Sequence, residues 1–555
     1  MAVTSGGSSS GSFMPMPPQA PNAIHHVGVS YNLLKGNPDG EYWSTGGEDP
    51  GVDLTRKIFT ISSGNQPPEV IMEHHDGCQN SHGFNLFYSP ESYQEKLFIN
   101  VQTSGASDAA LKPYAFSVSS GYQAVLQQTS KHHYIFQDAT SYCKIGHVRY
   151  SMNLASVDKY PVTREFASDV CSLPTTYNHD TYMQFIETWG THIMTEVTIG
   201  KASTNRYMAH LRDIFDFVVF NVSDDLSMGG PQDGFQTSYV IDIDSFKFRH
   251  EYKYIVGVFE DQLNIGDMYY NDVIAKTLMT IDSALDAKYW QYLQYYTGQH
   301  LCPMDAGSKL ITWKTNIARA LSEYPTFKNA VQPAKQALSM PATWPLGAYS
   351  MPKPTSGCPT SFVEGALTLP QASHSGAVPS GLNMDGTFTQ ASYTLKYCTK
   401  EDPSPSSYDI YWPRGDYCIQ QYDNRCPYAF RQGKIMLKLP SASSKTGTLP
   451  TGTYGQVSTE LQFCCRNDTV YTHKAFMPTD KPFYLFRNQH GCQQINGMTS
   501  TEEMVTFYND VTAVGSDSQT YLSGSYPYVE TSGQMGSKGA ASYTLHYCYY
   551  TQITK

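Results

Sequence analysis

Two hydrophobic periodicities meet within residues 182–200 (YMQFIETWGTHIMTEVTIG). Phe185 and Trp189 share the three-and-four spacing of an amphipathic helix, and the apolar residues then alternate over 193–199, as they do in a strand. The change occurs at Gly190, because glycine tolerates backbone conformations that other residues avoid. The pattern predicts a helix that leads into a strand through a bend at Gly190.

Residues 105–142 carry a pattern that fits two secondary structures. Tyr114, Phe116 and Val118 alternate with alanine and serine, which predicts a strand with one apolar and one small polar face. The stretch AVLQQTSKHHYIF at 124–136 spaces its apolar residues so that it can equally lie on a helix. Both interpretations stay open.

Residues 202–250 change their periodicity part of the way along. Met208, Leu211, Phe215 and Val218 follow a three-and-four spacing, which predicts a helix at the beginning of this range. The later stretch TSYVIDIDSFKFRHEYKYIVGVF alternates polar and apolar residues instead. It is therefore expected to extend a sheet.

Short strand-like motifs recur in the last third of the chain. ASYTLKYC at 391–398 and ASYTLHYC at 541–548 alternate and end in cysteine, so each predicts a half-buried strand tied at its end by a disulfide. The motif PxGxY occurs at 345–349, 413–417 and 450–454, where proline and glycine favour a turn before a strand. These recurring motifs indicate a duplicated all-β unit. The alternative is chance similarity in a region rich in Tyr and Gly.

The composition fits a protein rich in strands and turns. Of 555 residues, 40% are hydrophobic and 16% are charged, and Tyr, Gly and Pro number 42, 42 and 32; an average globular protein has about 25% charged residues. The prolines of the stretch VQPAKQALSMPATWP indicate a boundary between two domains. We expect a flexible tail at 1–21, without the regions of a signal peptide, then a domain at 22–330, a linker at 331–342 and a second domain at 343–555.

Cysteines are concentrated in the second domain. An even set of eight there, in a region rich in Gly, Pro and Tyr, is typical of a disulfide framework, which forms in oxidising compartments. We therefore expect a secreted, extracellular protein. The connectivity stays open, and zinc is the weaker alternative because no pair has CxxC spacing. The disulfide candidates are Cys358, Cys398, Cys418, Cys426, Cys464, Cys465, Cys492 and Cys548.

The charge balance excludes one large class of partner. The formal net charge is −11 and the isoelectric point is near 5.8, so no nucleic acid is expected to bind. No apolar run approaches the ~18 to 20 residues of a membrane-spanning helix. Attachment to a membrane is therefore expected to use a specific lipid head group, glycan or receptor rather than bulk electrostatics.

No group of residues has the spacing of a catalytic or metal site. His192 stands near Glu187 and Glu196, but a histidine packed at the bend is favoured, because no nucleophile or second ligand accompanies it. Three His doublets could sense acid but do not converge on one face of a helix or strand, as metal ligands must. These are His25/His26, His74/His75 and His132/His133. We expect no enzyme, no cofactor and no metal.

Two motifs of the first domain resemble the membrane attack complex/perforin (MACPF) family. They are YNLLKGNPDG at 31–40 and WGTH at 189–192, the latter followed by a strand to Gly200; position 201 is Lys where the family pattern has a second glycine. The resemblance implies a strongly bent antiparallel sheet flanked by two helical clusters, which unfurl into transmembrane β-hairpins after a ring assembles. It assigns the signature and sheet bend to Trp189, Gly190, Thr191, His192 and Gly200.

By the same resemblance, the ranges 105–142 and 202–250 are the membrane-inserting segments. A tilted strand crosses a bilayer with ~9 to 11 residues, so two such segments supply four crossings per subunit. A lone hairpin leaves its edge hydrogen bonds unsatisfied, so insertion must be coupled to ring closure. The alternative is that both are ordinary packing elements of a relative that does not perforate. The residues expected to insert are Tyr114, Phe116 and Val118, then Met208, Leu211, Phe215 and Val218.

The second domain resembles the C-terminal domain of apextrins, ApeC. The resemblance rests on WPLGAYSMP from 344, WPRGDYCI from 412, CPYAFRQG from 426, FCCR from 463 and GCQQINGM from 491. It implies an extracellular recognition module, associated in relatives with innate defence and with bacterial wall components. Candidates for stacking on sugar rings are Trp344, Tyr349, Trp412 and Tyr417, although burial in the core is the more common outcome for such aromatic residues.

Together these inferences predict an α+β MACPF domain followed by a disulfide-rich all-β ApeC domain. The expected function is a secreted pore-forming protein, a toxin or immune effector. It binds a membrane lipid, glycan or receptor of a target cell, assembles with itself into a homo-oligomeric ring and inserts β-hairpins. A non-lytic extracellular adhesion, matrix or microbial-recognition protein is the alternative.

Overall fold

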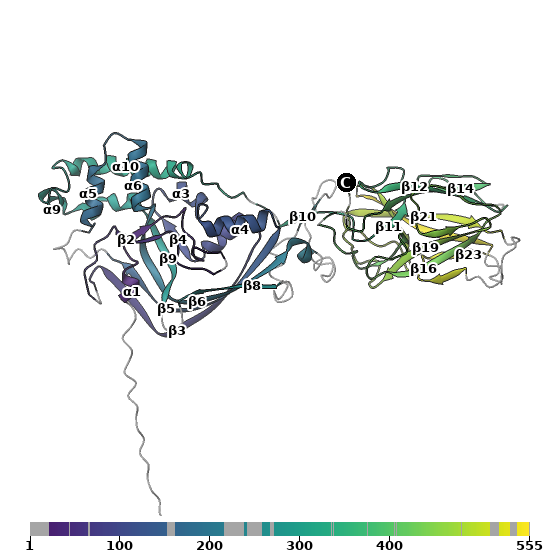
Figure 1. The fold of residues 1–555 in the computed structure, drawn as a ribbon, viewed down its shortest axis with the longest axis horizontal. Helices are drawn as coiled ribbons and strands as arrows, with labels where there is room; N and C mark the ends of the chain where they lie inside the picture. Colours follow the sequence, from purple (N-terminus) through teal and green to yellow (C-terminus); the bar gives the residue numbers. More distant parts are fainter. Residues whose placement is uncertain are drawn as a thin grey trace, which may run out of the picture. The chain divides into compact units, whose positions relative to one another are not determined.

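The protein forms two compact units, each with its own core (Figure 1). The first is built from described residues within 1–210 and 256–336, and the second from those within 211–255 and 337–555. The computed structural model describes residues 21–43, 45–64, 67–151, 161–215, 238–240, 258–266, 271–334, 336, 338–373, 376–404, 406, 408–478, 480–510, 521–532 and 541–553.

A mainly antiparallel sheet forms the centre of the first unit. Its long central strand β6 pairs with β1 and β5 along one edge and with β9 and β8 along the other; β2 then pairs with β1, and β3 with β5. The short strand β4 pairs in parallel with β9. The strands are β1 (Val29–Tyr31), β2 (Val52–Lys57), β3 (Val70–Phe87), β4 (Val101–Ser104), β5 (Tyr134–Tyr150), β6 (His192–His210), β8 (Val258–Ile265) and β9 (Asp272–Thr280).

The sheet is bent where irregularities in neighbouring strands line up. The register between β3 and β5, between β5 and β6 and between β6 and β9 shifts at one common level, and such bulges bend a strand and increase its twist. Two glycines at this level allow the close approach of neighbouring strands. An added Cβ would clash with the carbonyl of Glu73 at Gly146 and with that of Cys143 at Gly200. The predicted bent sheet is confirmed, and Gly146 supplies a second close approach from the adjacent strand.

Helices complete the main core of this unit, and in Figure 1 the curved strands run below them. Side chains of Ser89, Ser119, Thr163 and Asn178 accept backbone hydrogen bonds at the first turns of α2, α4, α5 and α6, which fixes where these helices begin. A disulfide, Cys171–Cys302, ties α5 to the chain before α10. The helices are α1 (Pro21–Ile24), α2 (Pro90–Leu97), α3 (Asp108–Leu111), η1 (Lys112–Tyr114), α4 (Ser120–Ser130), α5 (Arg164–Ser172), α6 (His179–Trp189), η4 (Ile281–Leu285), η5 (Ala287–Trp290), α9 (Leu293–Gly298) and α10 (Ala306–Phe327).

From residue 338 onward the described part of the second unit contains strands and no helix, and it consists of three similar repeats. In each repeat the third strand lies between the first and the second, and a short strand pairs beside the third. The first strands of successive repeats also pair with one another. The repeats are β11 (Tyr349–Pro352), β12 (Val363–Pro370) and β14 (Ser392–Lys400); β15 (Asp416–Gln421), β16 (Arg431–Lys438) and β19 (Ser458–Asn467); and β20 (Phe483–Arg487), β21 (Met498–Tyr508) and β24 (Ser542–Gln552).

Shorter strands complete this unit. They are β13 (Gly386–Phe388), β18 (Gly452–Tyr454) and β23 (Val529–Ser532) beside the third strands, β17 (Ser444–Gly447), which pairs with β12, and β22 (Leu522–Gly524), which pairs with β16. A separate pair of strands is formed by β7 (Ser238–Val240) and β10 (Ser339–Pro341). No helix among the described residues is both long and apolar enough to span a membrane.

A disulfide occupies the same place in all three repeats. It joins the loop after the first strand to the third strand, as Cys358–Cys398, Cys426–Cys464 and Cys492–Cys548. The two ASYTL motifs are the third strands of repeats one and three, with their alternate residues buried as predicted. The middle repeat was not predicted, because its third strand reads STELQFCC and shares with the ASYTL motifs only the alternation and the cysteine. A fourth bond, Cys418–Cys465, joins β15 to β19 within that repeat.

Candidate functional site

Four strands of the first unit end in one row. Phe87 at the end of β3 pairs with Phe136 of β5, which pairs with Met208 of β6, and Met208 in turn pairs with Val258 of β8. These four strands are all antiparallel to their neighbours. The connections that begin at this row therefore leave the sheet at the same end.

Two long connections begin here. Segment 1, residues 88–133, connects β3 to β5, and segment 2, residues 211–257, connects β6 to β8. Each joins two strands that are hydrogen-bonded neighbours. The two ranges predicted to insert into a membrane, 105–142 and 202–250, also include residues of β5 and β6. They do so because the alternation of apolar and polar residues continues across the ends of these strands.

Segment 1 is mainly helical in this structure and contains α2, β4, α3, η1 and α4. The helical interpretation of residues 124–136 is confirmed as far as Ser130, where α4 ends. Its apolar side chains belong to the main core of the unit. Those buried are Tyr93, Leu97, Val101, Leu111, Ala115, Phe116, Tyr122 and Val125.

The predicted strand around Phe116 is not a strand here. Phe116 is fully buried with φ of +65°, and Tyr114 and Val118 are half-buried against the same core. The amides of Phe116 and Val118 donate to the carbonyls of Leu33 and Leu34, at 2.8 and 2.9 Å. A bulky residue with positive φ costs about 1–3 kcal/mol, which the surrounding contacts must sustain.

The four residues predicted to insert from the second range divide into three groups. Met208 lies half-buried in β6, so the helical spacing was wrong at this position. Leu211 and Phe215 lie buried in a short helical stretch directly after β6. Val218 lies outside the described residues, as does most of the predicted strand region that follows it.

The WGTH motif forms the predicted turn from helix to strand. Trp189 ends α6, and Gly190 has φ of +72° and ψ of −174°, a combination essentially reserved for glycine. Thr191 then anchors the 31–40 motif, since its hydroxyl accepts from the amide of Leu33 at 2.9 Å and its own amide donates to the carbonyl of Tyr31. The motif therefore holds α6, β6 and the chain at 31–33 together.

His192 connects this turn to segment 1. Its side chain is fully buried, with Nδ1 2.9 Å from the Thr191 hydroxyl and Nε2 3.4 Å from a carboxylate oxygen of Asp108 in α3. Burial lowers the pKa of His192, and the nearby carboxylates of Asp108 and Asp282 oppose that shift only in part. The imidazole is therefore neutral at pH 7.

Replacing His192 with Gln is expected to reduce the pH dependence of stability. A pKa that is lower in the folded protein means that only the unfolded chain takes up this proton as the pH falls below about 6.5, so the wild type loses stability on acidification. His192→Gln should cost about 1 kcal/mol at pH 7.5 through weaker hydrogen bonds. Its stability should then fall less than that of the wild type between pH 6.5 and 5, measured by urea unfolding. Parallel pH profiles would contradict this role of His192.

Four charged side chains meet beneath segment 1. Arg206 of β6 donates to both carboxylate oxygens of Asp138 of β5, at 2.8 and 2.6 Å, and to Asp39 at 3.0 Å. Lys96 of α2 pairs with Asp39 and lies 3.0 Å from Asp138. Arg206 and Asp138 are fully buried, and the Lys96 and Asp39 side chains are 6% and 12% exposed.

The four charges of this cluster balance to zero. Burial raises the pKa of Asp39, but the charges of Lys96 and Arg206, with hydrogen bonds from both, outweigh it and lower this pKa to about 2. Stability from Asp39 is thus present above its ordinary pKa near 3.8 and is lost only as the pH falls toward 2. The cluster joins α2, β5, β6 and the loop at 35–43, four parts of the chain that sequence spacing could not bring together.

The four aromatic residues proposed for sugar recognition are not on the surface. Tyr349, Trp412 and Tyr417 are at most 1% exposed, and Trp344 is 8% exposed. They pack together: the rings of Tyr349 and Trp412 are 4.7 Å apart, and those of Trp412 and Tyr417 are 5.9 Å apart. In all three PxGxY motifs the Tyr hydroxyl donates to the carbonyl of the Pro, so these tyrosines fold the turn. The recognition assignment was wrong, and burial is their role.

A polar groove of about 610 Å³ lies on the middle repeat of the second unit. Part of the third PxGxY motif, which the sequence indicated only as a turn, forms one wall of it. Two half-buried tyrosines, an exposed lysine and several polar side chains contribute to its lining. Its lining is Tyr422, Asp423, Asn424, Lys445, Thr446, Gly447, Leu449, Pro450, Thr451, Gly452 and Tyr454.

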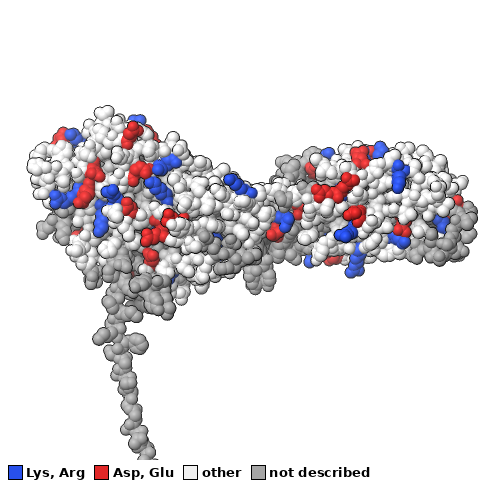
Figure 2. Space-filling model, viewed as in Figure 1, with Lys and Arg blue, Asp and Glu red and all other residues white. Residues whose placement is uncertain are grey.

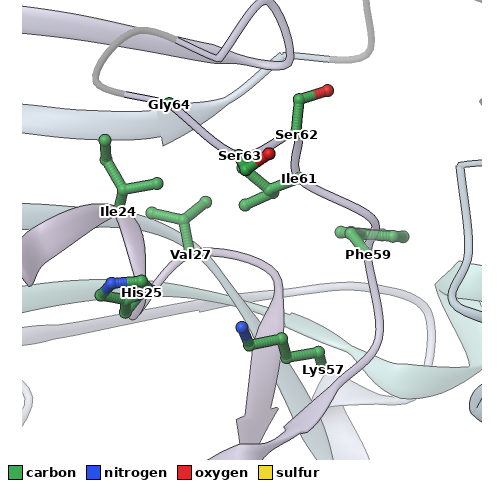
Figure 3. Close-up of a pocket in the computed structure, with 9 residues that line it drawn as sticks. All are labelled: Ile24, His25, Val27, Lys57, Phe59, Ile61, Ser62, Ser63 and Gly64. Atoms are coloured by element: carbon green, nitrogen blue, oxygen red, sulfur yellow. The ribbon is translucent and has the colours of Figure 1, made fainter. Parts of the chain in front are cut away.

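A second cavity, of about 360 Å³, lies in the first unit between α1 and the chain after β2 (Figure 3). Ile24, Val27, Phe59 and Ile61 give it apolar walls, and Lys57 stands at its rim. None of its lining residues belongs to segment 1 or segment 2.

The described surface carries no dominant charge on the face seen in Figure 2, where acidic and basic side chains are interspersed within each unit. Within the described part of the chain, no three His, Cys, Asp or Glu side chains are grouped so that they could hold a metal ion. All twelve cysteines are joined in disulfides.

Comparison with known proteins identifies both units. A family model of the MAC/Perforin domain matches residues 18–261, and one of the C-terminal domain of apextrin matches residues 344–550. The chain is therefore a MAC/Perforin-domain protein with an apextrin C-terminal domain. Neither is an enzyme family. The α+β and all-β classes predicted for the two domains are confirmed.

Several solved structures are similar to this chain. GNIP1Aa from Chromobacterium piscinae is 10% identical, with 80% of this chain and 82% of that chain covered and a TM-score of 0.34. A MAC/Perforin-domain protein from Bacteroides thetaiotaomicron is 12% identical, with 61% and 67% covered and a TM-score of 0.26. Vertebrate Astrotactin-2, a perforin-like membrane protein, is 9% identical, with 32% and 60% covered and a TM-score of 0.17.

Proposed function

We propose that this protein is a secreted pore-forming effector whose segments 1 and 2 refold into membrane-spanning β-hairpins. The row of four strand ends carries the proposal. Each segment already begins and ends on adjacent antiparallel strands, so extending β3 and β5, and β6 and β8, continues existing ladders without changing the strand order. A tilted crossing takes ~9 to 11 residues, and each segment is long enough for two.

Three further features support refolding of segment 1. Its connection folds into short helices rather than one stable helix, and short helices depend on tertiary contacts. Phe116 would lose its positive φ in an extended strand. Three charges under the segment, on Asp39, Asp138 and Arg206, are covered by it and pair with its own Lys96 or with one another.

The edges of the sheet support the proposed assembly into a ring. Among the described strands β3 pairs with β5 alone and β8 with β6 alone, so these two strands form the two sides of the four-stranded sheet at the row. β3 and β8 run in opposite directions. A second copy can therefore set its β8 antiparallel to β3 of the first, and closure of the ring satisfies the edges as a bilayer demands.

Recognition of the target is assigned to the second unit. The apextrin domain carries the polar groove, and its disulfides suit an extracellular environment. Half-buried tyrosine rings and an exposed lysine beside hydroxyl and carbonyl groups are suited to a polysaccharide, so we propose this groove as the site that binds a surface glycan.

Dye release from vesicles tests the pore. The purified protein is added to calcein-loaded vesicles made from total lipid extracts of bacterial and of animal cells, and the same vesicles are imaged for rings. Release with rings supports the proposal. Folded protein that binds the vesicles or insoluble peptidoglycan without release would instead identify a non-lytic recognition or adhesion protein, for which the burial of eight apolar side chains of segment 1 in the core is the specific observation.

Removing two groove side chains is expected to weaken glycan binding. Tyr422→Ala with Lys445→Ala should lower binding to insoluble peptidoglycan by about tenfold, the equivalent of ~1.4 kcal/mol, without loss of folding. The matched control is Tyr428→Ala, since Tyr428 is 70% exposed in the same repeat but does not line the groove. Equal binding by both variants and the wild type would remove the groove from the recognition surface.

A further inference from the structure

The 31–40 motif has a structural role that the pore proposal does not explain. Its second half, with the chain up to Trp43, lies between segment 1 and the sheet. On one side the Tyr93 hydroxyl of α2 donates to Asp39 at 3.1 Å, and the Ser120 hydroxyl of α4 donates to the carbonyl of Glu41 at 3.0 Å. This loop, residues 35–43, therefore contacts α2 and α4, the two longest helices of segment 1.

On its other side the loop is bound to the central strands. Arg206 of β6 donates to the carbonyl of Trp43 at 3.3 Å, and its guanidinium lies 4.4 Å from the centre of the Trp43 ring. Arg206 also contacts Asp39, as described above. A further ion pair fixes the start of the loop, since Asp49 accepts from the amide of Asn37 at 2.8 Å and from Lys276 of β9 at 2.8 Å.

We propose that the loop 35–43 and its buried charge cluster, Asp39, Lys96, Asp138 and Arg206, form a latch that holds segment 1 on the sheet, and that departure of Lys96 opens it. The inference rests on the proposed function, because it names the contact that controls release of segment 1. Lys96 is the only member of the cluster that segment 1 supplies. The other three stay with the sheet and the loop.

The electrostatics of the cluster make this contact switch-like. With Lys96 in place, two carboxylates face two cations in a largely buried site, where the most exposed side chain, Asp39, is 12% exposed. Without Lys96, two carboxylates share Arg206 alone, and a buried net charge is stable only if water reaches it. The cluster is therefore stable in two states: neutral and covered by segment 1, or charged and exposed to water after segment 1 has left. A state in which segment 1 is partly lifted and the cluster is dry but carries a net charge is disfavoured.

A charge change at Lys96 tests the latch in the water-soluble protein, before any membrane is added. Lys96→Met keeps the aliphatic stem but leaves the cluster with a net charge of −1. Hydrogen exchange of amides in α2 and α4 should become at least about tenfold faster, whereas exchange in β5 and β6 below the row should change little. The double variant Asp39→Asn with Lys96→Met is neutral again and should return exchange to within about threefold of the wild type.

Two further variants serve as a control for Lys96→Met and as a substitute for it. Lys309→Met makes the same substitution in an exposed ion pair with Asp305 and should change nothing. If Lys96→Met does not fold, Tyr93→Phe removes the hydroxyl that donates to Asp39 at 3.1 Å and to Asn37 at 3.5 Å, and it should still speed exchange in α2. Unchanged exchange in segment 1, or acceleration spread equally over the sheet, would overturn the latch and leave the cluster a purely structural one.

Dye release from the vesicles described above separates this inference from the proposed function. Faster release by Lys96→Met than by the wild type, with the double variant near the wild type, supports the latch within a pore-forming protein. Altered exchange without release by any variant would sustain the latch and overturn the pore. Release at equal rates by all variants, with unchanged exchange, would sustain the pore and overturn the latch.

Discussion

A disulfide between Gln102→Cys and Thr277→Cys is expected to abolish dye release. Gln102 lies on β4 within segment 1, Thr277 lies on β9 of the sheet, and the two are paired in the parallel ladder. Paired positions on adjacent strands lie at a separation that a disulfide can span. Segment 1 cannot leave the sheet while this bond is closed, so release by the oxidised variant should fall at least about tenfold, to the background of the assay.

The control for this experiment cross-links strands that the proposal leaves together. Thr198→Cys with Ala275→Cys joins β6 to β9, which remain paired in either form of the protein. Its oxidised form should release dye as the wild type does. The reduced Gln102→Cys, Thr277→Cys protein should also release dye, with the wild type treated identically because it has six disulfides of its own. Equal release by the oxidised and reduced proteins would show that segment 1 is not an inserting hairpin.

The second large effect is expected from Gly190→Ala in the WGTH turn. Gly190 has φ of +72°, and a methyl group there would lie 2.5 Å from the Ser30 hydroxyl oxygen and 2.7 Å from the Tyr31 carbonyl oxygen. Both the backbone conformation and the contact with backbone atoms oppose a side chain. We expect a loss of about 3 kcal/mol or more, because the strained conformation and the clash add.

Scanning calorimetry measures this loss. The transition of the first unit should fall by about 6–12 °C, and that of the second unit should not move, because a unit of this size shifts by roughly 2–4 °C for each kcal/mol. The matched control is Gly298→Ala at the end of α9, where a methyl group meets no atom within 4 Å and φ is ordinary. It should change stability by less than about 0.5 kcal/mol. An unshifted first transition in Gly190→Ala would contradict the role of this turn.

The sequence was most informative where local pattern and local structure coincide. The helix, the turn at Gly190 and the strand that follows were predicted from periodicity alone, and all three are confirmed. The two ASYTL strands were predicted for the same reason. Such features depend on neighbours in the chain, so spacing is sufficient to find them.

Other features depend on residues that are distant in the chain. The pairing of the eight cysteines could not be chosen, because any cysteine at a strand end satisfies the same local pattern. The cluster of Asp39, Lys96, Asp138 and Arg206 has no local signature, since in the sequence each of these residues resembles an ordinary surface charge. Burial of Trp412 and its neighbours was favoured only as the more common outcome for aromatic residues, because a tryptophan in a turn motif has the same sequence whether it faces the core or solvent.

The three repeats of the second unit have a consequence for how such a domain can change. Every covalent cross-link of this unit closes within a single repeat, so neighbouring repeats adhere through strand pairing and side-chain packing. One repeat could therefore be duplicated, replaced or altered as a whole without leaving a cysteine that has lost its disulfide partner. The surface residues of the domain can vary from repeat to repeat, while the disulfides of each repeat still form within that repeat.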